Sequence, residues 1–151
     1  MMRKGMVGGW FVFLLLLAIH AVDGKDFTEA QALIDKMAAK YPRLVRLTIH
    51  AVPAGETGSR IIACNVKKKI GQPSDPEDLE AMKTNRTVVL KEGDNLDVTA
   101  PILDKDGKPI AATGITLRFG KGESEDDVTA KAKRIAKELT EAIQNAKNPL
   151  W

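Results

Sequence analysis

The stretch Val98-Thr-Ala-Pro-Ile-Leu-Asp-Lys-Asp-Gly-Lys-Pro-Ile-Ala-Ala-Thr-Gly-Ile115 decides the fold. At its centre, residues 104–108 read Asp-Lys-Asp-Gly-Lys, and the residues on both sides are mainly apolar or β-branched. Glycine supplies the positive φ that a tight hairpin turn needs. We therefore predict two strands, at residues 95–103 and 110–119, joined by this turn.

Three further strands precede this hairpin. Residues 86–90 form one strand, which a Glu-Gly-Asp turn connects to the strand at 95–103. Residues 44–52 alternate between apolar and polar side chains, which is typical of a half-buried strand. Together with residues 59–66 they form a second hairpin across a Pro-Ala-Gly turn. Strands joined by tight turns predict an antiparallel sheet in an α+β domain.

Helices complete the predicted domain. Two long amphipathic helices, with apolar residues at steps of three and four, are expected near the ends of the chain, at residues 26–41 and 126–146. Between the strands, Ser74 and Glu77 fit a capping box that begins a short helix. We expect Leu79 and Met82 of this helix to face inward. The long helices can then cover one face of the sheet, and the short helix covers the other.

The N-terminus has the character of an export signal. The chain begins Met-Met-Arg-Lys, and residues 10–19 carry no charge. A basic start followed by a short apolar run is typical of a secretory signal peptide, and a membrane span needs about 20 apolar residues. We predict a signal peptide at residues 1–24 and a single domain at 25–151. The domain would then be periplasmic or secreted, or anchored at the membrane if the signal is retained.

Composition limits the classes of partner. Without residues 1–24 the chain has 21 basic and 19 acidic side chains, and aromatic residues make up 5% of the whole sequence. This near balance and the few stacking platforms argue against nucleic acid as a partner. Cys64 is the only cysteine, so an exported domain has no internal disulfide and depends on hydrophobic packing. Within its apolar run Cys64 is expected to be buried.

The sequence offers few candidate residues for catalysis or for metal binding. His50 is the only histidine after residue 24, and no second cysteine or histidine completes a zinc set. Asp104 and Asp106 resemble the start of a calcium loop, but the later glutamate ligand is missing. No G-x-S-x-G motif occurs. We expect no catalytic residues, no metal and no cofactor, and therefore not an enzyme, although a pairing of His50 with Cys64 remains an alternative.

One face of the predicted sheet could bind a ligand. Its candidate ligand-binding residues are polar side chains of the first and fifth predicted strands and the arginine that begins the third: Arg46, Thr48, His50, Arg86, Thr116 and Arg118. Ala112 and Gly114 beside them leave room, and polar groups among small residues are what a pocket requires. The basic residues Arg46, Arg86, Lys67 and Lys69 would suit a carboxylate. The alternative is that this face is simply exposed to solvent.

A family resemblance adds to this interpretation. Lys69-Ile-Gly-Gln-Pro-Ser-Asp-Pro-Glu-Asp-Leu-Glu-Ala-Met-Lys83, together with the stretch from Val98 to Ile115, resembles the Cache sensor domains, which are PAS-like modules of extracytoplasmic receptors. The resemblance implies a PAS/profilin-like five-stranded antiparallel sheet in the order 2-1-5-4-3, with long N- and C-terminal helices on one face. It also implies a small-molecule pocket between the sheet and residues 67–90.

The resemblance implies a function as well. Members of the family commonly bind organic acids, amino acids or similar metabolites, so we expect a secreted or periplasmic binding module without its own transducer, with a membrane protein as a further partner. Two alternatives remain open. One is a structural or interaction protein whose sheet face is closed by Leu79 and Met82. The other is a haem-binding protein, suggested by a similarity from Asp106 onward to small secreted haem-binding proteins, with His50 or Met82 as axial ligand.

Overall fold

The computed structural model describes residues 27–151, so the predicted signal peptide lies outside the described part of the chain. The elements follow in the order α1 (Thr28–Lys40), β1 (Leu44–Ala51), β2 (Arg60–Cys64), η1 (Lys67–Lys69), α2 (Pro76–Thr84), β3 (Val88–Glu92), β4 (Asn95–Leu103), β5 (Pro109–Arg118) and α3 (Glu125–Gln144). None of the helices within residues 27–151 combines the length and the apolar character that crossing a membrane requires.

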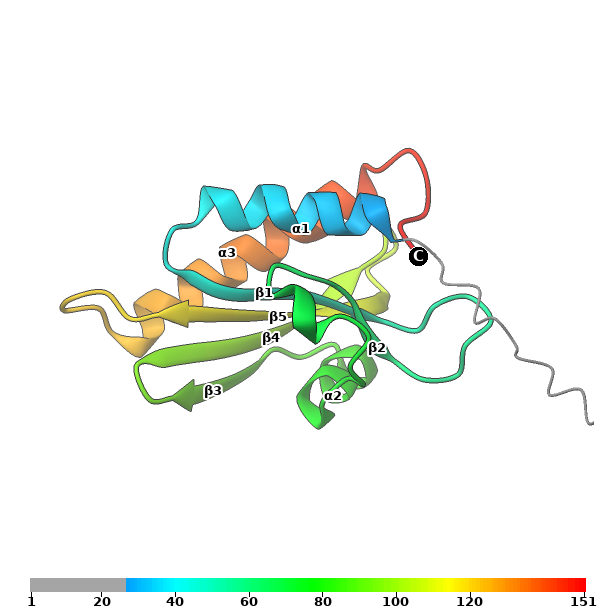
Figure 1. Ribbon diagram of the computed structural model, residues 1–151. Helices are drawn as coiled ribbons and strands as arrows, with labels where there is room; N and C mark the ends of the chain where they lie inside the picture. Colours follow the sequence, from blue (N-terminus) through cyan, green and yellow to red (C-terminus); the bar gives the residue numbers. More distant parts are fainter. Residues whose placement is uncertain (1–26) are drawn as a thin grey trace, which may run out of the picture.

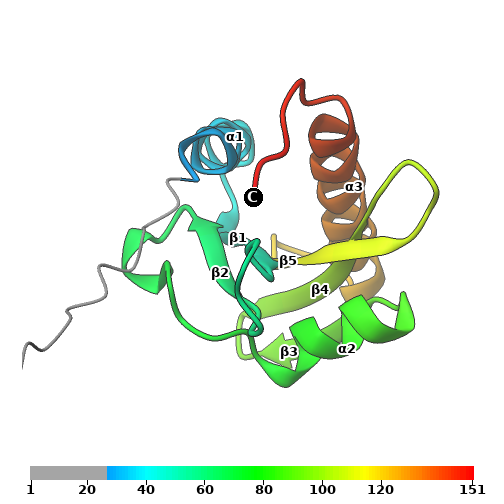
Figure 2. The ribbon, with the colours of Figure 1, turned by 90° about the vertical axis from the view of Figure 1, so that its right-hand side faces the viewer.

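The five strands form one antiparallel sheet in the order β2-β1-β5-β4-β3. Figures 1 and 2 show α1 and α3 side by side on one face of this sheet and α2 on the other, with the C-terminus between α1 and α3. Gly107 adopts a φ of 80° in the turn between β4 and β5, as the Asp-Gly sequence predicted. The predicted α+β class and strand order are confirmed.

The hydrophobic core lies between the sheet and the two long helices. Leu47 and Ile49 of β1 are fully buried there, against Ile34 of α1 and Leu139 of α3. Burial of an aliphatic side chain of this size contributes about 1.5–3 kcal/mol. The C-terminal residue Trp151 packs against the same core, which ties the end of the chain to the helices.

The second face of β1 differs from the prediction of a half-buried strand. Thr48 and His50 keep only 1% and 4% of their surface exposed. The sequence pattern placed them on a polar face beneath the short helix, and α2 packs over β4 and β5 while the segment that leads to it contacts His50 of β1 through Ser74. Both faces of the strand are therefore buried from Leu47 to Ala51.

The short helix also differs from the prediction in which of its residues face inward. The prediction that Leu79 faces inward is wrong, because 48% of its surface is exposed, while Asp78 and Ala81 are buried. The helix starts at Pro76, so the capping contact is made by Asp78, whose carboxylate accepts the Asp75 N–H at 2.9 Å, and not by the predicted Ser74 and Glu77.

Candidate functional site

A cavity of about 140 Å³ lies between the sheet and the segment that carries η1 and α2. We call it the sheet cavity. Its walls come from β1, β2, β4, β5, η1 and the first turn of α2. Only Ile61, Pro73 and Gly114 among the lining residues are apolar or small, so the wall is mainly polar. This is the region, between the sheet and residues 67–90, where the sequence predicted a pocket.

His50 is at the centre of the buried polar wall. Its Nδ1 lies 3.0 Å from Oδ2 of Asp78, and both side chains are about 95% buried. The other ring nitrogen, Nε2, lies 2.9 Å from Oγ1 of Thr48. His50 thus lies between Asp78 and Thr48 in one buried polar cluster.

Two serines support the same histidine from the side of the covering segment. Ser74 Oγ lies 3.1 Å from His50 Nδ1 and 2.7 Å from Oγ of Ser59. Ser74 directly precedes the α2 cap, so this contact fixes the start of α2 against β1. The histidine is held by groups from both layers of the cavity.

Thr48 also contacts the main chain of the neighbouring strand. The Gly114 N–H donates to Thr48 Oγ1 at 3.0 Å, and the Gly114 carbonyl oxygen lies 3.2 Å from the same hydroxyl. A Cβ atom at position 114 would lie 2.8 Å from Oγ1, which is too close for an unshifted structure. Glycine is thus required here by the close approach of the threonine.

A second polar pair lies on the β4 side of the cavity. Asp97 accepts the Thr116 hydroxyl at 2.7 Å, and its other carboxylate oxygen is 3.5 Å from Nη2 of Arg46. At 3.5 Å the contact between the two charges is long for a hydrogen bond. Arg46, whose side chain is about one-third exposed, therefore keeps donors for a further partner.

Charges of both signs surround the cavity. Lys69 and Arg46 are the cations of its wall, and the carboxylates are Asp75, Glu77, Asp78 and Asp97. Within residues 27–151, Lys69 and Glu77 form no ion pair with another side chain. An unpaired cation and an unpaired carboxylate thus line one cavity, and each is free to contact a charged group of a ligand.

The structure brings together half of the six predicted site residues. Arg46, Thr48 and His50 line the cavity. Thr116 is buried behind it and acts on it through Asp97. Arg86 and Arg118 are exposed and outside the cavity wall.

Of the lysines considered beside the predicted site residues, Lys69 lines the cavity. Lys67 instead pairs with Asp35 of α1 at 2.6 Å.

Asp78 and Asp97 are two of the wall residues that sequence reasoning missed. Asp97 could have been found, because alternation along residues 95–103 places it on the same side as Thr99, which also lines the cavity. Asp78 lies in the first turn of α2, where an acidic side chain is expected for the helix N-terminus alone. That role is real, but the same carboxylate also binds His50.

Neither the buried Cys64 thiol nor a metal-ligand cluster contributes reactive groups to this site in the described part of the chain. Burial raises the pKa of the Cys64 thiol above its usual range, so the sulfur stays protonated and unreactive at neutral pH. No cluster of three or more histidine, cysteine, aspartate or glutamate side chains suited to a metal occurs in the part of the chain that the structure describes. The cavity is smaller than the roughly 300–1,000 Å³ of pockets for drug-sized ligands, so its size suits a compact molecule.

Comparison with known proteins gives structural relatives only. No protein-family model matches the chain, and no curated protein matches its sequence. The GAF domain region of a membrane protein from Geobacter sulfurreducens PCA superposes with a TM-score of 0.55 at 14% identity, over 80% of this chain and 93% of that one. The GAF domain of a two-component sensor histidine kinase from Bacillus halodurans has a TM-score of 0.52 at 18% identity, over 76% and 92%.

The inducer-binding domain of the PobR transcription factor from Acinetobacter matches with a TM-score of 0.50 at 11% identity, over 78% of this chain and 97% of that one. At these identities the likeness concerns the fold. It agrees with the predicted PAS-like sheet, since the solved relatives are mostly GAF sensor domains. The Cache type stays a prediction.

Proposed function

We propose that this chain is an exported, non-catalytic binding protein that holds a compact small molecule of the organic acid or amino acid type in the sheet cavity. The observation that carries the proposal is the buried polar cluster in which His50 lies 3.0 Å from Asp78 and is hydrogen-bonded to Thr48. Burying polar groups lowers stability unless they are hydrogen-bonded. Apolar side chains would fill the same space at a smaller cost in free energy. A polar wall around an open cavity is what a polar ligand needs.

The charges of the cavity favour a ligand with both signs. Arg46 and Lys69 would bind a carboxylate, and Glu77, Asp75 or Asp97 would bind an ammonium group. A dicarboxylic acid would place its second negative charge among four carboxylates, which is unfavourable in a partly desolvated site. Within the proposed ligand types we therefore favour a zwitterionic amino acid over a simple organic acid.

The structural relatives are compatible with this function. The PobR domain was solved with 3-hydroxybenzoic acid, so a sheet of this kind holds a small acid in at least one protein. The Cys64 thiol, the alternative partner of His50 in catalysis, is buried and its pKa is raised, which supports a role without catalysis. The basic, then uncharged, start of the chain supports export, and a membrane protein is the further partner that we propose.

The alternative of an interaction protein with a closed face receives less support. It required Leu79 and Met82 to fill the space beneath the short helix. Leu79 is exposed, and a cavity with a polar wall occupies that position.

A thermal-shift screen tests the proposed function. The purified protein is heated with each common amino acid and with a panel of mono- and dicarboxylic acids. A ligand at 100 times its dissociation constant should stabilise the fold by about 2.7 kcal/mol. The Arg46→Ala variant should lose this effect, whereas Arg118→Ala, which removes an exposed arginine outside the cavity, should keep it. If no compound in either panel stabilises the protein, the proposal fails.

A further inference from the structure

A second hollow lies on the opposite side of the molecule, where α1 ends and α3 passes. Its volume is about 200 Å³. Tyr41, Pro42, Leu117 and Ile135 provide its apolar surface. It is therefore unlike the sheet cavity, whose wall is polar, and it is formed by residues from the helix-bearing side of the sheet.

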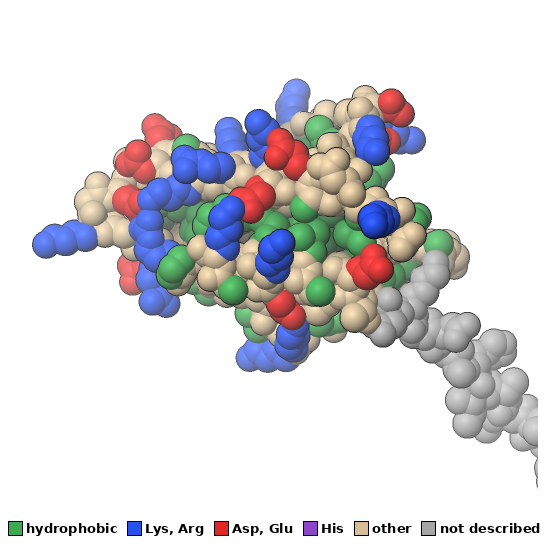
Figure 3. All heavy atoms as spheres, turned by 90° about the horizontal axis from the view of Figure 1, so that it is seen from above, with side chains coloured by type: hydrophobic (Ala, Val, Ile, Leu, Met, Phe, Trp, Pro, Cys, Tyr) green, Lys and Arg blue, Asp and Glu red, His purple; other side chains and the backbone are tan. Residues whose placement is uncertain are grey.

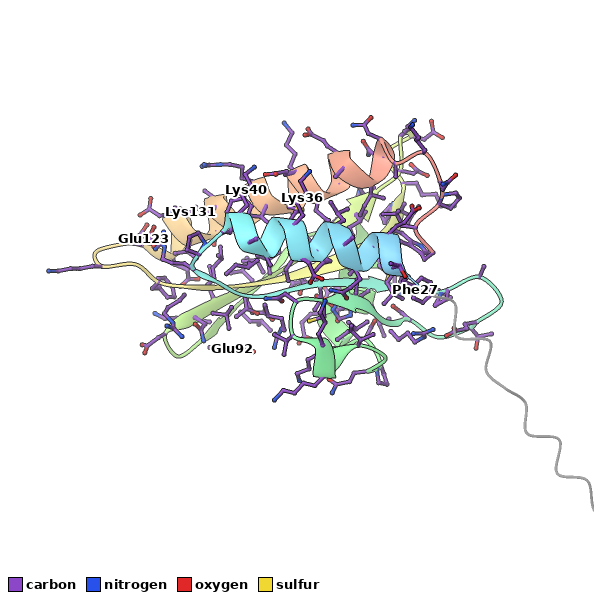
Figure 4. All side chains as sticks on the ribbon, turned by 45° about the horizontal axis from the view of Figure 1, so that its top comes forward. Phe27, Lys36, Lys40, Glu92, Glu123 and Lys131 are labelled. Carbon is purple, nitrogen blue, oxygen red and sulfur yellow. The ribbon has the colours of Figure 1, made fainter. Side chains whose placement is uncertain are left out.

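Cations surround this apolar surface. Arg43, Lys131 and Arg134 line the hollow itself, and Lys36 and Lys40 lie along the adjoining end of α1. We call these residues and the apolar surface the basic hollow. Figure 4 shows Lys36, Lys40 and Lys131 at the same end of the two helices. Figure 3, which looks onto the helix-bearing side, shows lysine and arginine side chains around a strip of apolar atoms.

Two acidic side chains face the basic hollow, and both already bind residues of the hollow. Glu123 binds Arg43, at 3.0 Å between Nη2 and Oε1, and also Lys131. Glu138 accepts hydrogen bonds from Lys40, at 2.6 Å, and from the Tyr41 hydroxyl. Arg134 has no carboxylate within ion-pair distance among residues 27–151. The cations outnumber the carboxylates, so the basic hollow keeps a positive surplus.

We propose that the basic hollow docks an acidic segment of a partner protein, with one apolar side chain inserted between Tyr41 and Ile135. An apolar cavity of about 150 Å³ accepts a benzene-sized group, so 200 Å³ suffices for one leucine or phenylalanine side chain. Interfaces gain much of their affinity from one such buried anchor, while complementary charges around it select and orient the partner. The surplus of cations calls for acidic residues on both sides of the anchor.

The basic hollow is lined from the α1 and α3 side and the sheet cavity from the α2 side, and Figure 2 shows these helices on opposite faces of the sheet, so a partner and a small ligand can be bound at the same time. The inference does not depend on the proposed ligand, because none of the residues of the basic hollow lines the sheet cavity. Failure of one proposal therefore leaves the other intact.

A designed peptide probes the docking surface. The probe is a fluorescein-labelled peptide with one leucine between two pairs of glutamates, titrated with the purified protein in its processed form at low salt and followed by anisotropy. Arg134→Glu should weaken binding at least about tenfold, which corresponds to about 1.4 kcal/mol. Lys108→Glu, the same change of charge in the exposed turn between β4 and β5, is the matched control and should change affinity less than twofold.

Two further peptides distinguish the contribution of the apolar anchor to binding from that of the acidic residues. Replacing the leucine by serine, or all glutamates by glutamine, should each weaken binding several-fold. The proposal is overturned if Arg134→Glu binds the probe as wild type does, if the serine peptide binds equally well, or if the protein sediments with phosphatidylglycerol vesicles but does not bind the probe. Arg134 is exposed, and Arg134→Gln serves as a milder variant should charge reversal lower the melting temperature.

Discussion

Thr48 of β1 and Gly114 of β5 form a reciprocal contact in which the threonine hydroxyl receives the glycine N–H at 3.0 Å and lies 3.2 Å from its carbonyl oxygen. Along β1 the same hydroxyl lies 2.9 Å from Nε2 of His50. One side chain thereby links the main chain of β5 to the buried histidine. The wall of the sheet cavity is consequently sensitive to any added volume at position 114.

Gly114→Ala should lower the free energy of unfolding by about 1–3 kcal/mol, because its Cβ would lie 2.8 Å from Thr48 Oγ1 and force the hydroxyl away. Urea denaturation measures the change. Gly58→Ala, at an exposed position where a Cβ meets nothing within 4 Å, should stay within about 0.5 kcal/mol of wild type. Equal stability of the two variants would contradict the close approach.

Asp78→Ala should destabilise the protein by about 2–4 kcal/mol. The change removes the buried carboxylate 3.0 Å from Nδ1 of His50 and the capping contact to the Asp75 N–H. Glu80→Ala, on the exposed side of the same helix, is the control and should change stability by less than about 0.5 kcal/mol. Chemical unfolding followed by circular dichroism distinguishes these results, and a loss below 1 kcal/mol for Asp78→Ala would show that the pair is not important for stability.

Much of this architecture could be predicted from local patterns. The bounds of β4 follow directly from the Glu-Gly-Asp and Asp-Lys-Asp-Gly turns on either side of it. Periods of two and about 3.6 residues located the other strands and the long helices, because their apolar faces are set by neighbours along the chain. The strand order came only through the family resemblance.

The candidate site could be predicted in part, because its contacts join distant segments. Alternation placed Arg46, Thr48 and His50 on one face of β1, and that grouping holds. No local pattern shows that this face is covered, since the cover depends on how residues 65–84 return across the sheet. For the same reason the partnership of His50 with Asp78 had no signal in the sequence.

Thr113→Val should stabilise the protein by about 1 kcal/mol. The Thr113 side chain is fully buried, and its hydroxyl has no hydrogen-bond partner. Valine has the same shape without the unsatisfied polar atom, whose burial costs about 1–3 kcal/mol. Thr48→Val is the matched control, because it removes a hydroxyl that is hydrogen-bonded, and it should destabilise. Thermal unfolding of both variants tests the contrast, and a lower melting temperature for Thr113→Val would refute it.

The ion pair between α1 and α3 predicts a pH dependence. Hydrogen bonds from Lys40, and then from Tyr41, hold the pKa of Glu138 below its ordinary value of 4.5. Because the folded pKa is the lower one, the contribution to stability is fully present above pH 4.5 and is lost as the pH falls through the folded value. Glu138→Gln should therefore be less stable than wild type at pH 7, and the difference should shrink below pH 4.5.

Urea unfolding of both proteins between pH 2.5 and 7 measures this convergence. Glu141→Gln provides the control, because Glu141 on the same helix makes only a 3.8 Å contact with Lys137 and both side chains are more than half exposed. The free energy of unfolding of Glu141→Gln should differ little from that of wild type, and the difference should be nearly constant with pH. Tyr41→Phe, which removes one of the two donors to Glu138, should show an intermediate loss at pH 7 with the same convergence in acid. A difference between wild type and Glu138→Gln that persists unchanged at pH 2.5 would mean that the glutamate stabilises through packing and not through its charge.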